Sequence, residues 1–139
     1  MILLDTNILS EMMCPAPALA VERWLAAQPD ASLFISAITE AELRYGAALL
    51  PGSKRLALTA EIDGMLEEEF DGRVLPFDRR AAQDFAAIAA DRRQAGRPIS
   101  QADAQIAAIA RSRGASLATR NVPDFDGCGV EVINPWSAA

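Results

Sequence analysis

Hydrophobic residues follow two different periods along the chain, which predict short strands separated by longer helices. Apolar runs of three or four residues, typical of buried strands, lie at positions 2–4, 33–35, 74–77, 116–118 and 130–133. Between them, apolar residues recur at helical spacing over about 18–27, 36–50, 58–70, 78–96 and 100–113. This alternation predicts an α/β fold in which a mostly parallel sheet of about five strands carries helices on both faces.

Residues that cap helices mark the predicted boundaries. Ser36, Asp78 and Ser100 each precede a helical pattern and can accept a hydrogen bond from an N–H of its first turn. Gly72 and Gly114 follow the ends of two patterns, where glycine commonly ends a helix. The chain has 139 residues, 51% of them hydrophobic, and no linker tract or repeat interrupts it. We therefore expect one domain over 1–139.

The amino-acid composition indicates where the protein is located and which kinds of catalytic site it can have. No apolar run approaches the roughly 18 residues of a membrane span, and the N-terminus lacks a basic, apolar leader, so we expect a cytoplasmic protein that contacts no membrane. Cys14 and Cys128 are expected to be free thiols. The chain has no histidine, which excludes histidine-dependent hydrolases and histidine-ligated zinc sites. Any catalysis must therefore rely on carboxylates.

Two polar segments directly follow predicted strands. Asp5 ends the run 2–4, and the segment with Asn121 and Asp124 follows the strand that ends at position 118. In open parallel sheets, ligands bind beyond the C-terminal ends of the strands, so these side chains are candidates for function. A plain turn is the alternative for both acids, because Asp commonly hydrogen-bonds the backbone that follows it.

Two further acids lie on predicted helices. Glu42 shares a helical face with Ile38, Tyr45 and Leu49, so we expect it to face the core, where a carboxylate needs a partner. Asp103 begins an apolar stripe that continues through residues 106, 107 and 110. It also ends an SQAD segment that fits a capping box, so a cap and a ligand are both open for Asp103.

Several carboxylates in one crevice repel one another unless protons or a cation neutralise them. Oxygen ligands without histidine or thiolate favour Mg²⁺ or Mn²⁺, ions that bind phosphates and lower the pKa of bound water. Phosphodiester hydrolysis is the reaction that this combination favours.

Four segments in order, MILLDTNILSE, ISAITEAELRYGAALL, GRPISQADAQIAAIARSRG and LATRNVPDF, resemble the PIN-domain ribonucleases, specifically the VapC and FitB-type toxins. The resemblance covers nearly the whole chain, including LPFD at 75–78 and NPW at 134–136. It implies a three-layer α/β/α PIN fold and places Asp5, Glu42 and Asp103 at the family's metal-binding positions. Many relatives carry a fourth acid where this chain has Asn121, which puts a second metal in doubt. Asp124 either compensates or is a turn residue.

The resemblance implies an Mg²⁺- or Mn²⁺-dependent endoribonuclease whose candidate catalytic positions are Asp5, Glu42, Asp103, Asn121 and Asp124. Thr6 and Asn7 are candidates for orienting water. The implied partners are an RNA substrate, a small antitoxin of the VapB/FitA type that blocks the acidic site, and a second copy in a homodimer. The alternative is a catalytically silent PIN-like or receiver-like domain that binds Mg²⁺ and a partner. A haloacid-dehalogenase-type phosphatase is disfavoured, because Asn7 replaces the second acid of DxDx[TV].

The net charge of −6 opposes RNA binding, so local arginines must compensate. Arg44 and Arg120 neighbour the candidate acids in the sequence. Arg92, Arg93 and Arg97 form a second group, which is either an RNA track or a helix C-terminus that complements its dipole.

Overall fold

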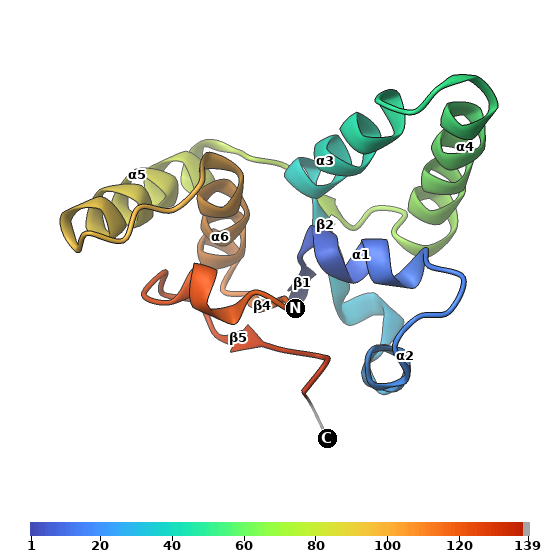
Figure 1. Ribbon diagram of the computed structural model, residues 1–139. Coiled ribbons are helices and arrows are strands. Elements are labelled where there is room, and N and C mark those ends of the chain that lie inside the picture. The colour runs from blue at the N-terminus through green and yellow to red at the C-terminus, as the bar shows by residue number, and fades with distance from the viewer. Residues whose placement is uncertain (138–139) are drawn as a thin grey trace.

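The computed structural model describes residues 1–137, and a five-stranded parallel sheet lies at its centre (Figure 1). The strand order is β3-β2-β1-β4-β5, and every neighbouring pair is parallel. The strands are β1 (Ile2–Leu4), β2 (Leu33–Ser36), β3 (Val74–Leu75), β4 (Ser116–Ala118) and β5 (Val132–Ile133). The chain runs outward from β1 through β2 to β3 and then returns to the other side of β1, so the strand order reverses between β1 and β4. A reversal of this kind opens a crevice at the C-terminal ends of the strands.

Helices cover both faces of this sheet. They are α1 (Thr6–Met12), α2 (Leu19–Ala26), α3 (Ala37–Ala48), α4 (Gly52–Glu69), α5 (Arg79–Gln94) and α6 (Gln101–Arg113). Two 3₁₀ turns, η1 (Asp30–Ser32) and η2 (Val122–Phe125), complete the described elements. In Figure 1, α5 and α6 lie together on one side of the sheet and α1 to α4 lie on the other. The α/β class and the three layers expected from the sequence are confirmed.

Two hydrophobic clusters hold the layers together, and they divide at adjacent residues of β1. Leu3 packs into the cluster formed with α5 and α6, and Leu4 packs into the cluster formed with α1, α3 and α4. Both side chains are fully buried because successive residues of a strand point to opposite faces. The uninterrupted apolar run at 2–4 is therefore what a strand covered on both faces requires.

The helix boundaries match most of the cap predictions. Ser36 Oγ, Asp78 Oδ1 and Ser100 Oγ accept hydrogen bonds from first-turn N–H groups at 3.0, 3.0 and 3.2 Å. Gly114 ends α6 with φ = 65°, a left-handed conformation that glycine adopts without a steric penalty.

Three expectations need correction. Helix α1 starts directly after β1, although the sequence pattern led us to expect the first helix at about residue 18. It was missed because its seven residues are too short for a helical period to emerge. Strands β3 and β5 each have only two residues, since the apolar residues beyond them pack without continuing the ladder.

The thiol expectation is confirmed, because Cys14 and Cys128 are both free. None of the helices within residues 1–137 combines the length and the apolar character that a bilayer crossing needs.

Arg92, near the end of α5, is buried although it carries a charge. It donates to three carbonyl oxygens, those of Arg97, Asp124 and Asp126, at 2.7, 2.8 and 2.9 Å. These bonds join α5 to the loop before α6 and to η2. Arg92 is therefore a structural clamp, and this arginine is unavailable to bind RNA.

Replacement of Arg92 tests the clamp. We expect Arg92→Leu to lower the free energy of unfolding by about 3 kcal/mol, because three carbonyl oxygens lose the charged donor that a buried side chain supplies. The exposed neighbour provides the control, and Arg93→Leu should change stability by less than about 0.5 kcal/mol. Urea unfolding of both variants measures the difference. Equal decreases in the free energy of unfolding for the two variants would show that the hydrogen bonds of Arg92 do not stabilise the fold.

Candidate active site

An open cavity of about 460 Å³ lies at the C-terminal ends of β1 and β4. It gathers side chains that are far apart in the sequence, from the two ends of the chain and from α3 and α6. The lining residues are Asp5, Thr6, Asn7, Ser10, Glu11, Cys14, Glu42, Asp103, Arg120, Asn121 and Trp136. Three candidate acids, Asp5, Glu42 and Asp103, are thus brought to one place, as the sequence predicted.

Asp5 is the buried centre of the cavity, with only 5% of its surface exposed. Its Oδ1 accepts from the backbone N–H of Thr6 at 2.8 Å. Its Oδ2 accepts from the hydroxyl of Thr119 at 2.7 Å and from the amide of Asn7 at 3.2 Å. Asp5 is also the N-cap residue of α1. The turn contacts expected for Asp5 are present, and the bonds that begin α1 also fix the direction of its carboxylate.

Burial raises the pKa of Asp5 above its ordinary value of 3.8. The hydrogen bonds from Thr119 and Thr6 lower the pKa and partly offset burial, because they stabilise the charged form. The negative charges of Asp103 and Glu42 raise the pKa further. The Asp5 carboxylate is thus held in one direction by hydrogen bonds, but within residues 1–137 no positive charge beside it balances the neighbouring acids.

Asp103 lies in the first turn of α6 and is partly buried. Burial raises its pKa, a hydrogen bond with Ser100 lowers it, and the charges of Asp124 and Glu42 raise it again. The backbone N–H of Asp103 donates to Ser100 Oγ, so the serine half of the predicted capping box is present. The carboxyl group nevertheless lines the cavity, and the structure therefore agrees with both roles considered for Asp103.

Glu42 reaches the cavity from α3 for a reason other than the expected one. The face that it shares with Tyr45 and Leu49 is directed to solvent, and those two side chains are each 67% exposed. Helix α3 buries Thr39, Leu43 and Ala47 instead. The inward stripe predicted from spacing is wrong, because apolar residues lie on both sides of this helix and spacing alone does not select one.

Threonine hydroxyls connect the acids to the scaffold. The hydroxyl of Thr6 donates to Glu42 Oε1 at 2.7 Å and lies 3.1 Å from Thr39 Oγ1. Thr119, directly after β4, was missed by the sequence reasoning although it is fully buried against Asp5. The available signal was the one that selected Asp5, a polar residue that directly follows a buried strand.

Asn121 and Asp124 have different positions. Asn121 lines the cavity, and its backbone N–H donates to Thr119 Oγ1 at 3.1 Å. Asp124 lies in η2, where its backbone N–H donates to the carbonyl of Asn121 at 3.0 Å. Its carboxylate is close enough to raise the pKa of Asp103 but is not part of the cavity lining. Asp124 therefore contributes charge from outside the wall of the cavity.

The arginine nearest Glu42 in the sequence is engaged elsewhere. Arg44 forms ion pairs with Glu40 and Asp63, each at 2.8 Å, and so joins α3 to α4. Arg44, one of the two arginines named beside the candidate acids, thus has its guanidinium held by two other carboxylates and does not line the cavity.

The donor chemistry of the cavity suits a hard divalent cation. Carboxylate, hydroxyl and amide oxygens surround it, and these are the ligands that Mg²⁺ and Mn²⁺ take. Within residues 1–137, no three Asp, Glu, His or Cys side chains lie close enough to enclose an ion between them. This spacing is compatible with Mg²⁺, which usually keeps several waters and takes one or two protein carboxylates.

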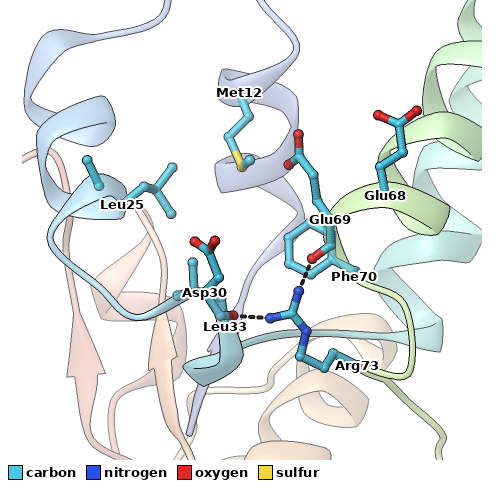
Figure 2. Close-up of a pocket in the computed structure, with 9 residues that line it drawn as sticks. Met12, Leu25, Asp30, Leu33, Glu68, Glu69, Phe70 and Arg73 are labelled. Carbon is cyan, nitrogen blue, oxygen red and sulfur yellow. Dashed lines mark hydrogen bonds between the residues drawn. The ribbon is translucent and has the colours of Figure 1, made fainter.

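A second cavity, of about 440 Å³, lies between α1, α2 and α4 (Figure 2). Met12, Leu25 and Phe70 contribute apolar surface to it. The guanidinium of Arg73 donates to the carbonyl oxygens of Asp30 and Glu69, as the dashed lines in Figure 2 show. Because Arg73 is bound to the backbone, it ties the end of α4 to η1, which precedes β2. None of the candidate residues predicted from the sequence lines this second cavity.

Comparison with known proteins agrees with this geometry. The model of the PIN domain family matches residues 2–125. The chain is 41% identical over 140 residues to the VapC ribonuclease Y4jK of Sinorhizobium fredii, with 100% of both chains covered. It is also 41% identical over 137 residues to the toxin FitB of Neisseria gonorrhoeae, with 98% of this chain and 99% of the relative covered.

A solved structure gives the same result in three dimensions. The structure of FitAB bound to an IR36 DNA fragment contains a chain that matches with a TM-score of 0.91 and 39% identity. The match covers 100% of this chain and 98% of that one. The sequence motifs, the order of the strands and the acidic cavity are all explained by the family: this chain belongs to the PIN-domain family, in the group of the VapC ribonucleases and the toxin FitB.

Proposed function

We propose that this protein is an endoribonuclease toxin that hydrolyses RNA phosphodiester bonds with the help of Mg²⁺ or Mn²⁺. The observation that carries the proposal is the convergence of Asp5, Glu42 and Asp103 on one open cavity at the switch point of the sheet. The names of the VapC relatives support the ribonuclease activity. The oxygen-rich lining supports the choice of ion.

Each acid has a distinct position in this proposal. Asp5 would be the central ligand, because its direction is fixed by Thr6 and Thr119. Glu42 and Asp103 would face the ion from α3 and α6, as ligands or through the waters that the ion keeps. When bound, the ion would supply a Lewis acid that stabilises charge on the phosphate oxygens and lowers the pKa of a water ligand. Asn7 and Asn121 have amide groups on the same cavity and would orient water or substrate.

The biological setting follows from the relatives. FitB is named a toxin, and its solved structure is a FitAB assembly on DNA. We propose that this chain acts in the cytoplasm as a homodimer, and that a small antitoxin of the VapB/FitA type holds it inactive by covering the acidic cavity. A catalytically silent PIN domain with the same partner is the competing hypothesis, and the experiments below discriminate between the two.

The first test removes the central carboxylate. We expect Asp5→Asn to lower the RNA cleavage rate about a thousandfold or more, because a charged ligand is lost where the transition state gains negative charge. Asp126→Asn is the matched control, since Asp126 pairs with Arg97 on the surface and lies outside the cavity. Initial rates on a labelled RNA give the comparison. Cleavage by Asp5→Asn at the wild-type rate would refute the proposed site.

The second test concerns stability and pH. Because the folded state raises the pKa of Asp5 and Asp103, their contribution to stability is fully present below pH 3.8 and is lost as pH rises through the raised values. At neutral pH both carboxylates are charged, and a cation that binds them in the folded state restores stability. Millimolar Mn²⁺ should therefore raise the thermal midpoint of unfolding. The increase should shrink as pH falls from about 7.5 to 5, because protons compete with the ion. Thermal melts across this range measure the increase, and an unchanged midpoint at pH 7.5 would refute the proposed ion site.

The third test separates the two roles of Asp103. Glutamine can still cap α6, so Asp103→Gln should remain folded but lose activity if the carboxylate is a ligand. Ser100→Ala breaks the observed cap bond and keeps the carboxylate, so it should lose about 1 kcal/mol of stability and remain active. Cleavage assays and urea unfolding of both variants give the answer. An active Asp103→Gln would assign this residue to capping alone.

A further inference from the structure

Arg120 is the single cationic side chain among the residues that line the acidic cavity. It follows β4 by two residues, and its side chain is exposed. Its backbone N–H donates to Asn7 Oδ1 at 3.3 Å, while the side-chain amide of Asn7 donates to Asp5. Arg120 is thus tied through one residue to the central carboxylate.

The Arg120 side chain has a specific aromatic partner. Its guanidinium carbon lies 5.0 Å from the ring centroid of Trp136, over the face of the indole. Trp136 is anchored in turn, because its backbone N–H donates to Asn134 Oδ1 at 3.0 Å and its ring packs against the hydrophobic cluster of α1, α3 and α4. An attraction between the cation and the ring orients the guanidinium while its N–H edges stay available to donate.

Three other arginines that the sequence offered for RNA contact, Arg44, Arg92 and Arg97, are engaged elsewhere. Arg44 is held by Glu40 and Asp63. Arg92 is buried on carbonyl oxygens, and Arg97 pairs with Asp126 at 2.8 Å. The guanidinium of Arg120 instead lies over an aromatic ring. The same cavity is lined by four acids, which are Asp5, Glu11, Glu42 and Asp103.

We propose that Arg120, oriented by Trp136, is the phosphate-binding residue that holds the RNA strand beside the reacting bond. This inference rests on the proposed ribonuclease function and adds a substrate contact to it. An RNA strand that approaches a chain of net charge −6 needs a local cation, and a guanidinium donates two parallel hydrogen bonds to a phosphate. Arg120 places that cation where RNA must enter the cavity. It is a binding group, so its loss should weaken substrate binding more than turnover.

The experiment compares RNA binding in an Asp5→Asn background, where cleavage is blocked. Arg120→Ala should raise the dissociation constant for a single-stranded RNA oligomer about tenfold and lower the salt slope by about one. Arg120→Lys should keep the salt slope and weaken binding about threefold, because an ammonium lacks the planar fork. Arg113→Ala is the control, since this exposed arginine lies ten residues beyond Asp103 on α6, about 15 Å along the axis. Fluorescence anisotropy at several salt concentrations supplies both quantities.

Trp136 gives an independent readout. With Trp24→Phe, Trp136 becomes the only tryptophan, and its emission should change when RNA binds beside it. Trp136→Leu should weaken RNA binding about threefold while it leaves the Mn²⁺-induced thermal shift unchanged, because no ion ligand is altered. In the cleaving enzyme, Arg120→Ala should raise KM about tenfold with kcat nearly constant.

The outcomes separate this inference from the function on which it rests. If the wild-type chain cleaves RNA but Arg120→Ala binds it with unchanged affinity and salt slope, Arg120 has no role in substrate binding. If Arg120→Ala weakens only the binding of the antitoxin, the residue belongs to the protein interface and the inference fails. If the wild-type chain neither binds nor cleaves RNA, the proposed function fails as well.

Discussion

The burial of one carboxylate, that of Asp5, is the constraint on which the arrangement of the site depends. A carboxyl group at 5% exposure is stable only with donors around it, and here they are Thr6 and Asn7 of α1 and Thr119, which follows β4. The same hydrogen bonds start α1 and join β1 to the segment after β4. Local structure and site geometry are therefore fixed by one set of contacts, and the carboxylate points into the cavity.

The hydrogen bonds orient Asp5 without neutralising it. Its pKa remains above the ordinary value because burial and the neighbouring acids outweigh the donors. Asp103 has the same imbalance, and Arg92 offsets it only in part. A site of this kind attracts a cation, and the divalent ion that we propose would supply the missing charge. Uncompensated negative charge is thus concentrated at the cavity, although the carboxylate oxygens of Asp5 are hydrogen-bonded.

The distribution of arginines follows from the same charge balance. An acidic chain has many carboxylates with which an arginine can pair, and most of the arginines near the site have been drawn into structural roles. Arg44 and Arg97 pair with carboxylates, and Arg92 fills a buried clamp. Arg120 differs because its partner is an indole ring, which orients a guanidinium without cancelling its charge.

The sequence predicted the features that depend on local physics. Cap residues and glycines set the boundaries of α3, α5 and α6, and the run 2–4 identified a strand buried on both faces. The motifs DTN, SQAD and TRN identified Asp5, Asp103 and Asn121 as residues of one cavity. Among the local expectations that failed, two concern helices: α1 was too short to show a period, and the Glu42 face was assigned to the core. Both errors arise where spacing carries too little information to decide.

Tertiary structure decided the contacts between residues that are distant in the sequence. Thr119 meets Asp5 across 114 positions, and Thr6 meets Glu42 across 36. Which arginine remains available at the cavity depends on where α3, α4 and η2 pack, and no sequence pattern encodes that choice. The sequence by itself determined which residues form strands and helices and which acids follow them, because those properties depend on neighbours along the chain. Only the packed sheet, with its reversal between β1 and β4, determined which of those side chains share a site.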